Sequence, residues 1–168
     1  MVEIHPMRIL THHMCFQLAL LHSTAFIFTL YRPQDDGCDV IGKVASQIDK
    51  ILVNNPSANI HVCGDFIVHH EEWLVHSNKT DPECRYCHYF SVAYELSQII
   101  YFPTHIPDVV GQYPNLLDLN TYPDLCSAYV SSPLDRSDHC MVTVAIDVQC
   151  KETSDEPFHC TSAAVAQW

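Results

Sequence analysis

A strand-like run followed by a helical pattern and a second strand-like run constrains the fold of this chain more than any other feature. Residues 24–31 are mostly β-branched or aromatic and are stopped at Pro33, which predicts a buried strand. Apolar residues then recur at helical spacing over residues 40–52, so an amphipathic helix is expected there. Residues 58–63 predict a second buried strand. This succession favours a layered domain in which helices cover a sheet.

Further elements follow in irregular order along the rest of the chain. The pattern predicts a shorter helix over residues 87–98 and an extended segment over residues 99–102. Strands are expected over residues 116–119, 128–130 and 140–146. Strands and helices mixed in this way predict an α/β domain built as a layered sandwich, in preference to a simple doubly wound sheet.

Length and composition exclude several classes of protein. The chain has 168 residues, of which 48% are hydrophobic and 17% are charged, so it has enough apolar material for one folded domain and is not wholly disordered. We expect residues 24–147 to form that domain, residues 1–23 to be weakly structured or divergent, and residues 148–168 to be a polar, disordered tail. The net charge of −12 argues against a simple electrostatic nucleic-acid binder. The sequence contains no apolar run of about 18 residues, so no membrane-spanning helix is predicted.

The cysteines favour a reducing compartment. There are nine, an odd number, and most are scattered singly through apolar runs, where a free thiol behaves as a small hydrophobe. We therefore expect the chain to be intracellular, in the cytoplasm or the nucleus. Residues 14–25 have the rough outline of a secretory signal, but His and Gln residues interrupt its apolar stretch.

Acidic residues stand at the ends of strand-like runs, where loops leave a rigid scaffold and sites are commonly built. Asp65 and Asp118 each lie among apolar residues, and an Asp in such a place is costly to bury unless it is paired or binds a metal. Asp138 and His139 come just before the last predicted strand of the domain, and Tyr31 ends the first. Singly, each Asp is more often a turn cap, but together they indicate a site.

The short sequence motifs (words) in which these residues occur resemble those of a known family. Residues 64–70 read GDFIVHH, similar to the GDFNxHH motif of the endonuclease/exonuclease/phosphatase superfamily as found in jockey-type non-LTR retrotransposons. The neighbouring words stand in the family's order: YRP at 31–33, PTHI at 103–106, NLLDL at 115–119, SPL at 132–134 and SDHC at 137–140. The resemblance extends over residues 26–146 and implies the α/β sandwich of that superfamily.

The resemblance implies Mg²⁺-dependent or Mn²⁺-dependent hydrolysis of a DNA phosphodiester. In that case Asp65 would polarise the attacking water and lie near the metal, and Asp138 would be a ligand on the metal side. His139 would stabilise the phosphate under attack, Asp118 would orient His139, and Tyr31 would contact the phosphate. Carboxylate oxygens are the ligands that Mg²⁺ prefers, and a carboxylate behind a His fixes the orientation of its ring.

The chain also departs from the family pattern. Ile67 stands where the motif has Asn, and loss of one preorganised donor typically costs about 10²–10³ in rate. The family's N-terminal half, which carries a metal-binding Glu and an Asn near the phosphate, has no match in the residues before Pro33. We therefore expect a domain truncated in its N-terminal half and weakly active or inactive, with a non-catalytic relic or interaction module as the alternative.

A third hypothesis is a small metal-binding protein. Cys84, Cys87 and His88 match the C-x-x-C-H pattern of haem attachment, and the two Cys with nearby His could in principle hold zinc. His69 and His70 follow the Asp65 loop and could approach the same cleft. His105 is interpreted as a residue that packs a loop.

Overall fold

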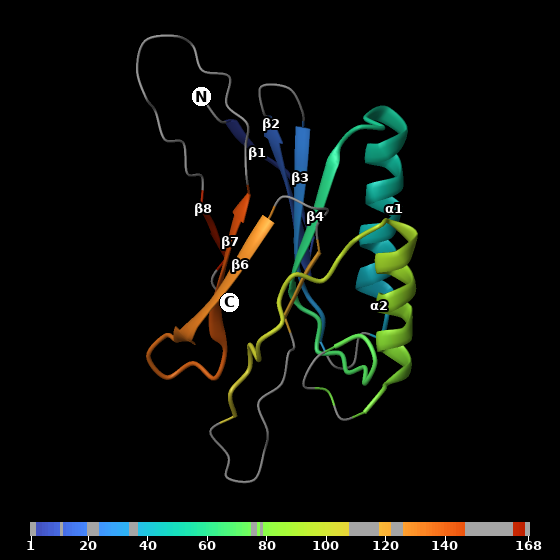
Figure 1. Cartoon of the computed structure of the whole chain (residues 1–168). Helices are drawn as coiled ribbons and strands as arrows, with labels where there is room; N and C mark the ends of the chain where they lie inside the picture. The colour runs from blue at the N-terminus through green and yellow to red at the C-terminus, as the bar shows by residue number, and fades with distance from the viewer. Residues whose placement is uncertain are drawn as a thin grey trace, which may run out of the picture.

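The computed structural model describes residues 3–10, 12–19, 24–33, 37–74, 77, 79–107, 118–121, 126–146 and 163–166. A five-stranded sheet of order β1-β2-β3-β4-β5 forms its centre, and a three-stranded sheet of order β6-β7-β8 forms a second layer. Helices α1 and α2 cover the face of the large sheet that is turned away from the small sheet (Figure 1). The predicted layered α/β sandwich is therefore confirmed.

The centre of the fold is the strand–helix–strand unit that the sequence predicts. Strand β3 (Thr24–Tyr31) has the predicted bounds, α1 extends over Asp39–Asn54, and β4 over Asn59–Asp65. The two strands pair in parallel, and both are buried along most of their length, which fits strands covered on both faces. Val44 and Ile48 of α1 are fully buried against this sheet, and burial of such a side chain is worth about 1.5–3 kcal/mol.

Two strands lie in the N-terminal segment for which the sequence predicts little regular structure. Strand β1 (Glu3–Leu10) pairs antiparallel with β2 (His13–Ala19), and β2 pairs antiparallel with β3. Cys15 and Leu18 of β2 are buried. The physical reason for the difference is that a strand is stabilised by its cross-strand neighbours, and the ready-made partner β3 compensates for the polar residues that interrupt the local pattern.

Helix α2 (Pro82–Ala93) begins five residues earlier than the predicted helix. The Asp81 side chain accepts a hydrogen bond from the Cys84 backbone amide at 2.7 Å, and Pro82 occupies the first turn, so both residues favour a helix start at this point. The helix ends before the predicted limit because Glu95 has a left-handed backbone with φ of 54°. Among the described residues, neither α1 nor α2 has the length and apolar composition of a membrane-spanning helix.

The remaining strands complete the two sheets. Strand β5 (Asp118–Thr121) pairs antiparallel with β4, and β6 (Cys126–Pro133) pairs antiparallel with β7 (Cys140–Ile146), whose bounds are the predicted ones. Strand β8 (Ala163–Ala166) pairs with β7, in the part of the chain for which the sequence predicts a disordered tail. Val142 and Val144 join the main core cluster, so the small sheet packs its inner face against the large one.

Candidate functional site

Three of the predicted site residues lie in one row across the large sheet. Tyr31 at the end of β3 is the register partner of Asp65 at the end of β4, and Asp65 is the register partner of Asp118 at the start of β5. Asp65 is buried and Tyr31 is half exposed. Thus the backbone pairing brings together three positions that are far apart in the sequence.

A close approach of β3 and β4 fixes the position of Asp65. Gly64 has φ of +140°, and a Cβ atom placed there would lie 1.8 Å from the backbone oxygen of Leu30. Only glycine fits where two backbones approach so closely. The glycine of the GDF word therefore has a packing role, which is to let Asp65 leave the sheet beside Tyr31.

Arg32 holds the loop that follows Asp65. Its backbone amide donates to the Asp65 carbonyl at 2.9 Å, and its guanidinium donates to the carbonyls of Phe66 and Ile67 and, at 3.0 Å, to that of Gly37. The side chain is buried, at 3% exposure, and the rigid fork of a guanidinium suits several carbonyls at once. Sequence reasoning identified the Tyr-Arg-Pro word but gave Arg32 no role. The structure shows that Arg32 positions the Asp65 loop.

The residue that departs from the family motif has an unfavourable backbone. Ile67 has φ of 46°, in the left-handed region, where a β-branched side chain is a genuine outlier. Asn tolerates this region far better because its short polar side chain bonds locally. The loop therefore has a backbone suited to the motif's Asn although the side chain is Ile.

A second group of residues forms where two motif words meet. The Cys140 amide donates to the Thr104 carbonyl, and the Ile106 amide donates to the Asp138 carbonyl, both at 2.7 Å. These two bonds enclose an antiparallel bridge between His105 and His139. The extended segment that follows α2 thus pairs with the start of β7.

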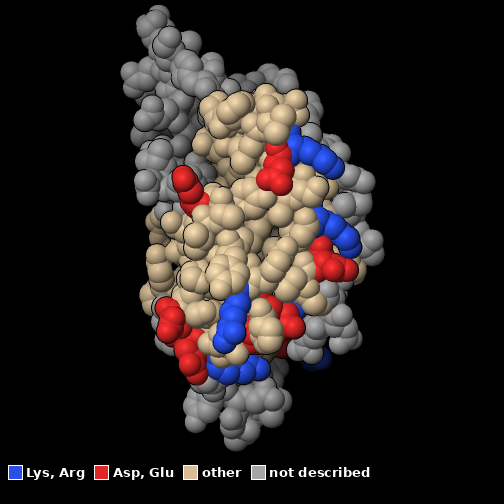
Figure 2. Space-filling view, turned by 90° about the vertical axis from the view of Figure 1, so that its right-hand side faces the viewer, with Lys and Arg blue, Asp and Glu red and all other residues tan. Residues whose placement is uncertain are grey.

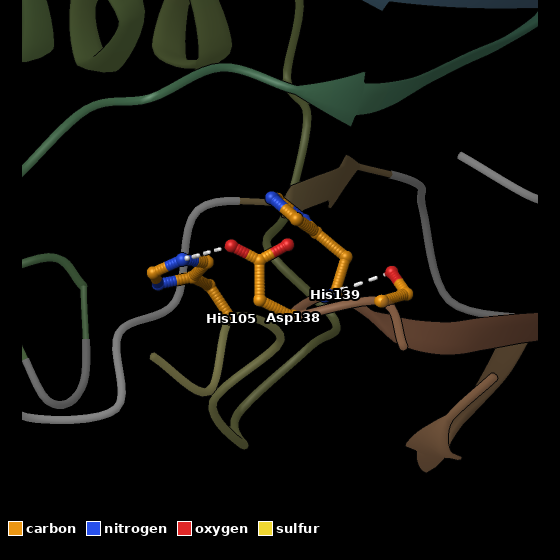
Figure 3. Close-up of polar contacts among 4 residues, drawn as sticks. His105, Asp138 and His139 are labelled. Atoms are coloured by element: carbon orange, nitrogen blue, oxygen red, sulfur yellow. Dashed lines mark hydrogen bonds and ion pairs between the residues drawn. The ribbon is translucent and has the colours of Figure 1, made fainter. Parts of the chain in front are cut away.

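The bridge places two imidazoles around one carboxylate. Nε2 of His105 lies 3.2 Å from Oδ2 of Asp138, and the rings of His105 and His139 have centroids 5.1 Å apart (Figure 3). The His139 amide donates to Oγ of Ser137 at 3.1 Å, which fixes the turn before β7. One ligand atom from each of His105, Asp138 and His139 can be chosen so that all lie within 4.8 Å of one another. A divalent cation fits this donor set.

The charges in this group favour the ionised form of Asp138. Desolvation raises its pKa, but hydrogen bonds from its own backbone and from His105, together with the charges of His105 and His139, lower the pKa below its ordinary value. The carboxylate is therefore ionised at neutral pH and available to a cation. Its side chain is about half exposed, so a ligand can reach it from solvent.

His105 has a different place from the one predicted for it. The sequence interpretation made it a loop-packing residue, whereas the structure pairs it with Asp138 and sets its ring against that of His139. The position of the PTHI word in the family order was the one signal that pointed to this segment. The local sequence could not show which later residue it would meet.

The other candidate histidines have structural contacts. Nδ1 of His70 accepts hydrogen bonds from the backbone amides of Glu72 and Trp73, at 3.2 and 3.1 Å, so His70 caps a turn. The His69 amide donates to Oδ2 of Asp81 at 3.0 Å, which ties the loop after β4 to the start of α2. Among the described side chains, neither His joins a group of three that could hold a metal ion.

The Cys-His motif gains no support as a metal centre. Cys84 and Cys87 are buried in α2, and desolvation is the main cause that raises the pKa of both thiols, that of Cys87 to about 12. Buried thiols of this kind pack as small hydrophobic groups. Within the part of the chain that the structure describes, Cys84, Cys87 and His88 do not form a group with metal-binding geometry.

Comparison with known proteins identifies the fold. Neither a protein-family profile nor a curated protein sequence matches the chain. Solved structures of the endonuclease/exonuclease/phosphatase type do match it, so the chain has that fold, as the sequence words predict. The resemblance is thereby confirmed at the level of the fold.

Two of these structures illustrate the extent of the likeness. The endonuclease domain of TRAS1, a telomere-specific non-LTR retrotransposon, matches with a TM-score of 0.71 and 15% identity, over 89% of this chain and 70% of that chain. A truncated TDP2 from Caenorhabditis elegans matches with a TM-score of 0.52 and 11% identity, over 84% of this chain and 64% of that chain.

Proposed function

We propose that the chain is a nuclease-like domain that hydrolyses a phosphodiester of DNA with a divalent cation, at a low rate. The observation that supports this function best is that residues from different sequence motifs lie next to one another in the fold. The row of Tyr31, Asp65 and Asp118 is set by strand register, and the group of Asp138 and His139 is set by the start of β7. Both groups are on the fold shared with the TRAS1 endonuclease domain.

The proposed roles are those that the family resemblance implies, and the chemistry of each side chain is consistent with its role. Asp65, an acidic group at the end of β4, would accept a proton from the attacking water. His139 would donate a hydrogen bond or a positive charge to the phosphate, and Asp118 would orient that imidazole. Tyr31 is half exposed, so its hydroxyl can contact a phosphate oxygen. The resemblance makes Asp138 and Asp65 the residues that would hold the cation.

Mg²⁺ or Mn²⁺ is the cation that the family resemblance implies. The residues present fit a cation because the ionised carboxylate of Asp138 is half exposed and has further ligand atoms beside it. A bound divalent cation would neutralise the charge that develops on the phosphate during hydrolysis.

DNA is proposed as the substrate from the likeness to a retrotransposon endonuclease domain. The face covered by α1 and α2 offers little attraction to a phosphate backbone, because its Lys and Arg residues are interspersed with Asp and Glu (Figure 2). A cation at Asp138 would instead supply positive charge where the substrate binds. The low expected rate follows from Ile67, which lacks the hydrogen-bonding group of the motif's Asn.

A plasmid-nicking assay with Mg²⁺ or Mn²⁺ tests the proposal. We expect slow nicking by the wild-type chain and a loss of about tenfold or more in Asp138→Asn. Asp135→Asn is the matched control, because Asp135 is exposed in the same connection between β6 and β7 and lies outside the group at His139. Nicking that is absent in the wild type, or equal in wild type and Asp138→Asn, would contradict the proposal.

A non-catalytic module is the second candidate, and Ile67 is the observation that favours it. The exposed apolar side chains of Tyr101, Phe102 and Ile106 could then contact a partner. Nicking that depends on Asp138 excludes this candidate, whereas a folded chain without nicking supports it.

A further inference from the structure

We infer that Tyr101 and Phe102 bind unpaired bases of the DNA substrate, which makes single-stranded DNA the substrate class that the proposed site prefers. The inference rests on the proposed function for the position of the scissile phosphate, and it deepens that function by naming the form of DNA that is recognised. Three observations carry it: the exposure of two neighbouring aromatic rings, the anchoring of the segment to which they belong, and the closeness of this segment to His139.

Two large aromatic side chains that follow one another in the chain are exposed to solvent. Tyr101 is 59% exposed and Phe102 is 68% exposed. Burial of such side chains stabilises a fold, so a neighbouring pair left in solvent indicates a contact surface more strongly than a single exposed residue does. Aromatic rings stack on nucleobases, and this stacking tolerates every base because every base has a π-face.

Buried residues on both sides hold this aromatic pair in place. Ile100 is 2% exposed and belongs to the main core cluster, and Thr104 is fully buried. The Thr104 carbonyl also accepts a hydrogen bond from the Cys140 amide at 2.7 Å. The exposed pair is therefore a short stretch of chain between two anchored residues, so binding of a base costs little backbone entropy.

The aromatic pair lies close to the group that is proposed to act on the phosphate. Its segment leads from the end of α2 toward the connection between β6 and β7 (Figure 1). Phe102 is three residues before His105, which forms the bridge with His139. An extended chain spans at most about 3.6 Å per residue, so the Cα atoms of Phe102 and His105 lie within about 11 Å of each other. Nucleotides of one stacked strand follow at about 3.4 Å, so a base within about three nucleotides of the scissile phosphate can reach the rings.

Stacking on these rings requires a base whose face is accessible. In a duplex the faces of each base are covered by its neighbours, and a protein reaches only the base edges in the grooves. The Phe102 ring has no hydrogen-bonding group with which to read such an edge. A single strand leaves its base faces accessible, so the aromatic pair favours single-stranded DNA over intact duplex.

Net charge contributes little to this recognition. The chain has a net charge of −12, whereas proteins that hold DNA mainly by its phosphates have a basic surface. Stacking on an aromatic ring does not require a basic protein. We therefore expect the affinity for a single strand to fall only slightly with added salt, in contrast to binding that depends on many phosphate contacts.

Fluorescence anisotropy on the full chain tests the inference. The probe is a labelled phosphorothioate oligothymidylate, which resists hydrolysis, and it is compared with its duplex in the presence of Mg²⁺. We expect the wild type to bind the single strand at least about tenfold more tightly than the duplex. Phe102→Leu should weaken single-strand binding about tenfold, because Leu is apolar but has no ring, and Phe102→Trp should retain the affinity. Tyr89→Leu is the matched control, because Tyr89 is 70% exposed but lies on α2, outside this segment.

Further measurements separate the failures. Circular dichroism verifies that each variant is folded, and Tyr101→Leu is a second variant if Phe102→Leu is unstable. Equal affinity for single strand and duplex, equal affinity in folded wild type and folded Leu variants, or a steep loss of affinity with salt would overturn the inference. Absence of binding to both probes would also overturn it, and would leave the pair for the protein partner of the second candidate function.

The plasmid-nicking assay distinguishes this inference from the proposed function. Nicking that depends on Asp138, in a chain that shows no preference for the single strand, would refute the inference while the proposed function stands. Single-strand binding that depends on Phe102, in a chain that does not nick, would support the recognition of unpaired bases and contradict the proposed hydrolysis.

Discussion

The backbone of Ile67 provides a sharp test of how the Asp65 loop is held. Its φ of 46° is in the left-handed region, and the Arg32 guanidinium donates to its carbonyl, so the backbone has little freedom to relax. The test replaces Ile67 with Asn, the motif residue, and with Thr, which is also polar but β-branched. Both variants remove the half-buried apolar side chain, and they differ mainly in their tolerance of the left-handed region.

The expected magnitude follows from two opposing terms. Left-handed backbone costs an ordinary L-residue about 1–2 kcal/mol, and most of that cost is relieved by Asn but not by Thr. Loss of a half-buried Ile costs about 1 kcal/mol in both variants, taking half of a full burial term. We therefore expect Ile67→Asn to be close to wild type in stability. Ile67→Thr should be about 1 kcal/mol less stable than Ile67→Asn.

Equilibrium unfolding in urea measures this difference, provided that the denaturant slope is the same in all three proteins. The nicking assay gives a second readout, since the Asn amide restores a hydrogen-bonding group that Thr does not place in the same way. Equal stability of the Asn and Thr variants would refute the reasoning, because it would mean that Ile67 is not held in the left-handed region.

Three further predictions concern the scaffold. Gly64→Ala should destabilise the fold by about 3 kcal/mol or more, because its Cβ would lie 1.8 Å from the Leu30 oxygen. Gly37→Ala is the control: its Cβ has open space around it but its φ is positive, so the cost should be only about 1 kcal/mol. Thermal unfolding compares the two variants. Asp81→Ala should cost about 1–2 kcal/mol through loss of the α2 cap, and an unchanged melting temperature would contradict this. Burial lowers the pKa of His61 from 6.5 to about 4. Between these two pH values the unfolded chain binds a proton that the folded chain does not. The free energy of unfolding should therefore fall as the pH drops from 6.5 to about 4, by up to about 1.4 kcal/mol per pH unit. His61→Gln should flatten that pH dependence, and an equally steep curve in the variant would assign it to other groups.

Local sequence patterns were sufficient for the elements whose stability is largely local. Strand β3 and strand β7 have the predicted bounds, and α1 encloses the predicted helix, because continuous apolar runs and helical periodicity are properties of neighbouring residues. The early start of α2 was also encoded locally, in Asp81 and Pro82, and the helix prediction overlooked it. The layered α/β class followed from these elements together.

Other features depended on partners far away in the sequence. Strands β1 and β2 have interrupted patterns and are held by pairing with β3, which local propensity does not reveal. The motif words identified Tyr31, Asp65 and Asp118, but only strand register shows that they lie in one row. The catalytic roles given to them stay predictions.

The amino-acid sequence is enough to predict the class of fold, the order of the motifs and the acidic residues of the candidate site. That Arg32 holds the Asp65 loop, and that His105 lies with Asp138 and His139, is seen only in the folded chain. This difference arises because the bridge between His105 and His139 is made by backbone hydrogen bonds, which every residue type except proline can form in full. The side chains of the PTHI motif therefore do not indicate which later segment they contact in the fold.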